Sequence, residues 1–204
     1  MIISTGNIKI GKMSNISLTP IVSCAGCVTI CAKDCYAMKA YKQYPAVKNA
    51  WDTNYREAME DMTKFFTDIV AKIKKTKKTF FRWHVGGDII NLEYFMGMVF
   101  VAKMFPIIKF LAFTKQYEVV NEFRSGSKGR HAGKWELPAN LQVVFSAWPS
   151  LEMRNPYKFP VAFMQDGSET RVDGSEIECP GSCEGCGMCW SLSSIGKNVV
   201  FHKH

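Results

Sequence analysis

The positions of the cysteines constrain the fold of this chain more than any other feature of its sequence. The eight cysteines form two tight groups with none between them: Cys24, Cys27, Cys31 and Cys35, then Cys179, Cys183, Cys186 and Cys189. A small secreted disulfide protein spreads its cysteines along the chain, and a chain of 204 residues that is 47% hydrophobic can fold without such crosslinks. The grouping therefore predicts two metal-binding loops.

The C-terminal group lies in CPGSCEGCGMCW and has the spacing C-x3-C-x2-C-x2-C. Successive C-x2-C steps are typical of ferredoxin-like sites, whereas zinc sites more often use two C-x2-C pairs separated by a longer insert. We therefore expect iron–sulfur clusters of the [4Fe–4S] type. Zinc is the alternative metal, and a metal-free segment is the remaining alternative.

The N-terminal group lies in SCAGCVTICAKDCYA and has the spacing C-x2-C-x3-C-x3-C. Two of its steps match the first step of the radical SAM signature C-x3-C-x2-C, but no C-x2-C step follows either of them. Three ligands would leave one iron open to a substrate or cofactor. Four ligands would close the cluster and favour electron transfer or a structural role, and the spacing leaves both readings open.

Between the two groups, strand-like and helix-like stretches alternate. Strands are expected at 7–10, 79–85, 107–113, 141–147, 159–164 and 199–202, and helices at 45–75, 92–104 and 117–123. Such alternation indicates a parallel α/β fold, and the chain is short for eight βα units. We predict one iron–sulfur α/β domain over 1–204, with a partial (βα) barrel-like parallel sheet and both cysteine loops docked at one end of it.

Candidate binding residues follow two of the expected strands, where sites form in parallel folds. FRWHVGGD brings Arg82, His84, Gly86, Gly87 and Asp88 to one strand end, and Lys115 follows another. Paired glycines permit close approach of the backbone to a ligand, and Asp88 is a candidate acceptor for an amine or a ribose hydroxyl. The alternatives are a helix cap for Asp88, a core position for His84 and a plain exposed lysine for Lys115.

The net charge of the chain, its apolar runs and the pattern at its N-terminus bear on its partners and its location. The formal net charge is +8, and part of this excess comes from Lys72, Lys74, Lys75, Lys77 and Lys78. That segment is either a solvated helix end or a surface for nucleic acid or another anion. The sequence shows neither a membrane-spanning apolar run nor a signal-peptide pattern, so we expect no membrane partner and a cytoplasmic location. Without HExxH or a phosphate-binding glycine loop, an ordinary hydrolase or NTPase is disfavoured.

Several motifs occur in an order that resembles the phage-encoded gene product 88 family: FRWHVGGD, FTKQY, LPANLQVVFSA, CPGSCEGCGMCW and VVFHKH. Members are similar to this chain in an early cysteine loop ending in Cys-Tyr-Ala, here Cys35 to Ala37. They also share a late group ending in Cys-Trp, here Cys189 and Trp190. The family has no settled biochemical activity, so the resemblance implies a phage protein in the host cytoplasm and no particular reaction.

More distantly, the chain resembles reduced radical SAM proteins, which combine a partial βα barrel with an early three-cysteine loop. Gly86-Gly87-Asp88 is similar to their Gly-Gly-Glu motif, which contacts the methionyl amine of S-adenosylmethionine. This resemblance implies that Cys24, Cys31 and Cys35 are the three ligands and that Cys27 is additional. It also implies S-adenosylmethionine as a cofactor.

Three functions are compatible with these features. The first is a radical SAM-like redox enzyme with two cysteine-ligated clusters, an electron donor and a small-molecule substrate. The second is a non-catalytic iron–sulfur protein for electron transfer or redox sensing, with a nucleic-acid partner. The third is a structural zinc protein, in which metal binding supplies folding energy.

Overall fold

The computed structural model describes residues 1–6, 10–76, 78–126, 135–165 and 175–202, and its elements alternate along the chain. The strands are β1 (Ser14–Ile16), β2 (Phe80–Trp83), β3 (Lys109–Thr114), β4 (Leu141–Ser146), β5 (Val161–Gln165), β6 (Ile177–Glu178) and β7 (Val199–His202). The helices are α1 (Thr29–Lys33), α2 (Tyr36–Gln43), α3 (Pro45–Glu60), α4 (Met62–Ile73), α5 (Leu92–Met104), α6 (Tyr117–Ser125), α7 (Cys183–Cys186), the 3₁₀ helix η1 (Met188–Ser191) and α8 (Leu192–Ile195).

The strands form one seven-stranded sheet in the order β1-β2-β3-β4-β5-β7-β6, and every neighbouring pair is parallel. The predicted parallel α/β fold is confirmed. The barrel-like closure is not, because the sheet is open, with β1 and β6 at its two edges. Parallel strands all end on the same edge, so residues that follow β2, β3, β4 and β5 lie near one another.

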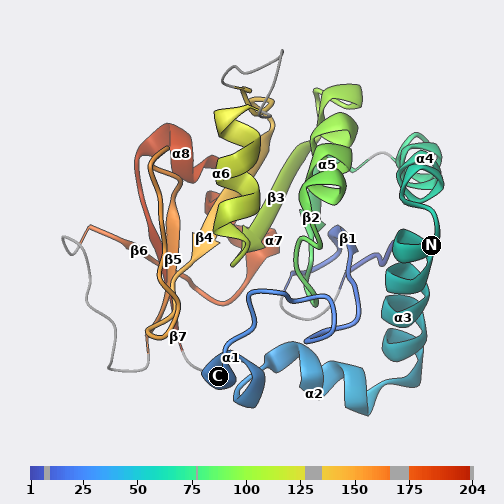
Figure 1. The fold of residues 1–204 in the computed structure, drawn as a ribbon, viewed down its shortest axis with the longest axis horizontal. Helices are drawn as coiled ribbons and strands as arrows, with labels where there is room; N and C mark the ends of the chain where they lie inside the picture. The colour runs from blue at the N-terminus through green and yellow to red at the C-terminus, as the bar shows by residue number, and fades with distance from the viewer. Residues whose placement is uncertain (7–9, 77, 127–134, 166–174, 203–204) are drawn as a thin grey trace.

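Helices cover one face of this sheet. Phe66 of α4, Met98 of α5 and Val120 of α6 are buried in one core with Trp83 of β2. Figure 1 shows α5 and α6 in front of the strands, with α3 and α4 to one side. Burial of this apolar surface is the main term that stabilises the layer.

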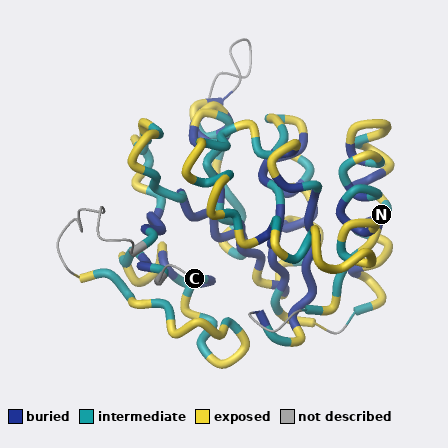
Figure 2. The backbone as a smooth tube through the Cα atoms, turned by 90° about the horizontal axis from the view of Figure 1, so that it is seen from below, coloured by how far each residue is buried: buried dark blue, intermediate teal, exposed yellow. Residues whose placement is uncertain are grey.

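The C-terminal cysteine segment covers the other face. Leu111 and Val144 point away from the helical core, since successive strand residues alternate between faces, and they pack with Trp190 and Leu192 in a second core. The central strands are therefore buried on both sides, as the dark-blue tube in the middle of Figure 2 shows. This corrects the expectation that both cysteine loops dock at one end of the sheet, because the second loop lies against a face.

Helix and strand predictions differ in accuracy along the chain. The helix at 92–104 and the strand at 199–202 are confirmed at both ends, and the predicted strand at 7–10 falls partly outside the described residues. The helix expected at 45–75 is two helices. Asp61 interrupts it with an extended backbone (φ −153°) and accepts a hydrogen bond from the Lys64 backbone N–H (2.8 Å), which caps α4.

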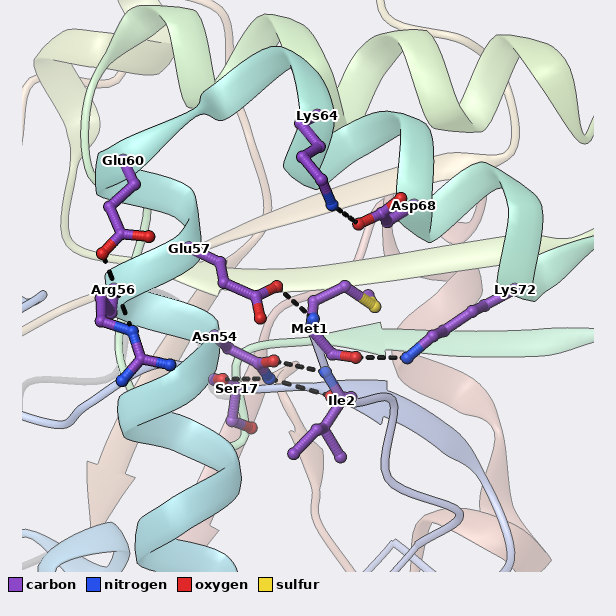
Figure 3. Close-up of polar contacts among 10 residues, drawn as sticks. All are labelled: Met1, Ile2, Ser17, Asn54, Arg56, Glu57, Glu60, Lys64, Asp68 and Lys72. Atoms are coloured by element: carbon purple, nitrogen blue, oxygen red, sulfur yellow. Dashed lines mark hydrogen bonds and ion pairs between the residues drawn. The ribbon is translucent and has the colours of Figure 1, made fainter.

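The first two residues are tied to α3 and α4 (Figure 3). The Met1 ammonium group pairs with Glu57, and Lys72 donates to the Met1 carbonyl oxygen. Asn54 accepts from the Ile2 N–H (2.5 Å) and donates to the Ile2 carbonyl oxygen (2.9 Å). Lys72, one residue of the basic segment, therefore has a structural contact that explains it without a nucleic acid.

Candidate functional site

A cavity of about 200 Å³ lies at the carboxyl edge of the sheet. Its walls come from the ends of β2, β3, β4, β5 and β7 and from the N-terminal cysteine segment. Figure 1 shows α1 and α2, which belong to that segment, across the bottom of the sheet. All five residues predicted for cofactor binding line it: His84, Gly86, Gly87, Asp88 and Lys115. The rule that sites form where parallel strands end therefore located the cavity.

Three of the four N-terminal cysteines line this cavity. They are Cys24, Cys31 and Cys35, whereas Cys27 is not among the residues of its wall. Burial raises the pKa of the Cys24 thiol to about 12 and that of the Cys31 thiol to about 11. Negative charge at Cys27 and Cys35 also raises the pKa of Cys31, which places the thiols of this group within electrostatic reach of one another.

The glycine pair allows the chain after β2 to pack closely. A Cβ atom on Gly86 would lie 2.6 Å from the Trp51 ring, and one on Gly87 would lie 2.6 Å from Ser23 Oγ. Gly87 also has φ +86°, a conformation that favours glycine. The Gly86 N–H donates to Ser17 Oγ (3.2 Å) and its carbonyl oxygen accepts from the Leu18 N–H (2.9 Å). Gly86 therefore joins β2 to the chain that leads into the cysteine loop.

Asp88 ties the ends of β2 and β3 together. It is 1% exposed, and its carboxylate accepts from the Ile89 N–H (2.7 Å), the Thr114 hydroxyl (2.6 Å) and the Lys115 N–H (2.9 Å). Asp88 does not cap α5, since Asn91 accepts the capping hydrogen bond from the Tyr94 N–H. The carboxylate is thus largely occupied by the protein itself.

Lys115 places a half-buried positive charge beside the cysteines. Burial opposes its protonated form, but the negative charge of Asp88 is the main effect that raises its pKa. Its ammonium nitrogen lies 5.8 Å from the centre of the Trp148 ring. A plain exposed lysine is therefore the wrong interpretation of this position, and its charge lowers the pKa of Cys24 and Cys31 against the effect of burial.

His84 is buried at the cavity wall in a strained backbone conformation. It is 4% exposed with φ +54°, which is uncommon for a residue with a side chain. Its Nε2 lies 3.0 Å from the Tyr94 hydroxyl oxygen, and its Nδ1 has no hydrogen-bond partner within the described part of the chain. Burial lowers its pKa to about 4, so the ring is neutral at pH 7. Strain of this kind is found at functional sites.

Arg82 lies between the two cysteine groups, and the sequence placed it near the strand end without indicating a role for it. It is 7% exposed, lines the cavity, and donates from Nη1 to Cys183 Sγ of the second group (3.9 Å). Its guanidinium carbon lies 5.0 Å from the centre of the Phe113 ring. An arginine inside the apolar run FFRWHV was the available signal, because a buried charge needs partners.

The C-terminal cysteines line a second, smaller space of about 20 Å³ on the face of the sheet. It is lined by Cys179, Cys183, Cys186 and Cys189, with Arg82, Phe113 and Phe201 shared with the larger cavity. Burial, then charge at the other three cysteines, raises the pKa of Cys189 to about 12. Among the described residues no cysteine lines both spaces, so the two groups form separate sites.

None of the eight cysteines, all of which lie in the described ranges, forms a disulfide, and each is half-buried. Within the ranges that the structure describes, no three His, Cys, Asp or Glu side chains are arranged so that they could hold a metal ion. The predicted metal binding therefore stays a prediction. In the same ranges, no helix is long and apolar enough to cross a membrane, as expected.

Comparison with known proteins identifies a family. No curated protein and no solved structure matches this chain. The family described as Gene product 88 matches residues 3–173, a range that contains the N-terminal cysteines and every cavity residue except Phe201. The match ends before Cys179, so the predicted resemblance is shown up to residue 173 and not for the C-terminal cysteine motif. The chain therefore belongs to the Gene product 88 family, the phage family that its motifs resemble.

Proposed function

We propose that this protein is an iron–sulfur protein in which Cys24, Cys31 and Cys35 hold a [4Fe–4S] cluster at the cavity. One iron without a cysteine ligand would face the space where a small molecule, S-adenosylmethionine as the first candidate, binds. The supporting observation is that these three cysteines, and not Cys27, line the cavity. A cluster with an open iron supplies an electron and a coordination position for a ligand.

The residues around the cavity fit that group. The Lys115 ammonium group lowers the pKa of Cys24 and Cys31, and the Arg82 guanidinium lowers that of Cys189, which opposes part of the rise that burial causes. Asp88 holds the backbone of Lys115 in place, and the neutral ring of His84 adds no charge to the wall. Apolar side chains such as Phe113 and Trp148 limit the access of water.

Loading requires the sulfur atoms to converge, and the cysteine segments are packed loosely enough to allow this. Neither α1, which carries Cys31, nor α7, which carries Cys183 and Cys186, contains a buried residue. Such elements rearrange at low cost because they lose few core contacts. Metal binding would then supply the free energy that orders them.

The C-terminal group is proposed to hold a second metal centre. Its four thiols surround one space, and Arg82 lies against it from the cavity side. Four cysteine ligands leave no open position, so this centre would serve in electron transfer or structure. An external one-electron donor of low potential would reduce the clusters.

The test is anaerobic purification followed by measurement of iron, zinc and acid-labile sulfide per chain, with an EPR spectrum of the dithionite-reduced protein. We expect about four or eight iron with equal sulfide. We also expect the EPR signal to change when S-adenosylmethionine is added. Zinc without sulfide would overturn the proposal.

The variant C24S, with C27S as its matched control, separates an open cluster from a closed one. C24S should lose the N-terminal cluster, and C27S should retain it together with its response to S-adenosylmethionine. Equal loss in both, with no response in the wild type, would instead support the non-catalytic four-cysteine alternative.

A further inference from the structure

Two buried nitrogen atoms on β2 and directly after it lack partners. Arg82 Nε and His84 Nδ1 have no hydrogen-bond partner among the residues that the structure describes, although both side chains are more than nine-tenths buried. Both residues line the 200 Å³ cavity. A buried polar atom without a partner costs free energy, and most such atoms are paired in folded proteins. Each of these two nitrogens exposes less than 1 Å² of surface, so a ligand in the cavity meets the charge of Arg82 and the uncharged ring of His84, not these two atoms.

The guanidinium of Arg82 is oriented before any ligand arrives. Its Nη1 is directed at Cys183 Sγ, and its plane lies by the Phe113 ring. A planar guanidinium matches the geometry of a carboxylate. His84 adds an uncharged ring, which its contact with the Tyr94 hydroxyl holds in place.

The charge of Arg82 favours an anion in the cavity. Asp88 offsets the charge of Lys115, whose pKa it raises, and its carboxylate is already occupied by three hydrogen bonds, so Arg82 supplies the remaining positive charge. Asp34, the other acidic residue of the wall, is exposed at the rim. The remaining wall includes Phe113, Trp148 and Phe201, which suit a flat apolar body.

We propose that the cavity binds a small carboxylate with a flat apolar body, whose carboxylate pairs with the charge of Arg82. This inference names the substrate class of the proposed function. It rests on that function, because it takes the bound carboxylate as the molecule on which the cluster acts. Arg82 lines both spaces, so a molecule paired with it would lie beside the N-terminal cysteines and one side chain away from the C-terminal group.

The experiment compares 3-phenylpropionate with its neutral analogue 3-phenylpropionamide by calorimetric titration of the metal-free protein at low salt. We expect the carboxylate to bind at least about tenfold more tightly, since a charge-assisted hydrogen bond is lost in the amide. R82Q should abolish this preference. R154Q, which removes one positive charge from a side chain that is 72% exposed, should retain it.

The inference would be overturned if the wild type bound the two probes equally or bound neither of them. This outcome does not depend on whether R82Q folds. Preference retained in R82Q would also overturn it. Iron and sulfide are measured on a reconstituted portion of the same preparation. If the protein prefers the carboxylate but takes up no iron, the proposed function is wrong and this inference stands. If the protein takes up iron but shows no preference, the proposed function stands and this inference is wrong.

Competition identifies the source of the carboxylate. If S-adenosylmethionine displaces 3-phenylpropionate from the iron-loaded protein, the site binds the carboxylate of this cofactor. The assignment of the site to a substrate is then overturned. If both bind together, the site belongs to a substrate.

Discussion

The two cysteine groups contain equal numbers of thiols and lie in very different surroundings. The N-terminal group lies beside a cavity of about 200 Å³ with buried polar side chains, and the C-terminal group surrounds about 20 Å³ against the apolar face of the sheet. The smaller space has room for about one water molecule. The volume of the adjoining space, more than the number of cysteines, therefore indicates which group meets a ligand.

The largest expected effect comes from removing one ligand of each group. C24S should lose about four iron per chain and every response to S-adenosylmethionine, because an open cluster needs all three of its cysteines. C183S should lose the second centre and keep the response at the first. Metal analysis and EPR spectra of both variants check this. If both variants lose both centres together, the two groups are not the independent sites that the cavity linings indicate.

Glycine substitutions should reveal the difference in packing between the two regions. A Cβ atom on Gly86 would meet the Trp51 ring at 2.6 Å, so G86A should lower the free energy of unfolding by about 1–3 kcal/mol. Gly185 has no atom within 4 Å of such a Cβ, so G185A should change it by less than about 0.5 kcal/mol. Urea unfolding of the metal-free protein measures both. Similar values for the two variants would contradict the tight packing assigned to the N-terminal site.

The carboxylate of Asp88 offers a second measure of how rigid the cavity edge is. D88N should destabilise the protein by about 1–3 kcal/mol, because an amide cannot accept all three of the hydrogen bonds that the buried carboxylate accepts. D68N alters an exposed carboxylate paired with Lys64 and should cost less than about 0.5 kcal/mol. A cost for D88N as small as that for D68N would mean that the ends of β2 and β3 are held by other contacts.

The smallest effect is a pH dependence of the metal-free protein. Burial raises the thiol pKa from an ordinary value near 9 to about 12 for Cys24 and about 11 for Cys31. A raised pKa in the folded state contributes stability that is complete below pH 9 and is lost as the pH rises toward 12. Thermal unfolding from about pH 8 to about pH 10 should show a falling midpoint, and C24S should reduce that slope. A flat profile would mean that these thiols are open to water.

The local parts of the fold were predictable because their signals are local. The helix α5 begins after its cap at Asn91 and ends before Pro106, and both are visible in the sequence. The break at Asp61 was missed because apolar positions continue at helical spacing on both sides of it. The short strands β1 and β6 were missed because three- and two-residue strands are defined by their neighbours in the sheet.

The cavity residues also divide into those with a local signal in the sequence and those whose role depends on distant residues. Asp88 and Lys115 were selected because each follows a strand, a relation that can be read along the chain. Arg82 was placed near the strand end but given no role, because its role depends on Cys183 and Phe113, which are distant in sequence.

By itself, the sequence determined that this chain alternates strands and helices, that its thiols form two groups, and which residues follow the strands. Only the tertiary structure decided that the sheet is open, that the second cysteine group lies on its face, and that Arg82 separates the two groups. The physical reason is the sequence separation of the residues on which each feature depends. Periodicity, caps and strand ends depend on residues a few positions apart, whereas a cavity depends on which distant surfaces bury one another, and many sequences satisfy the same local rules.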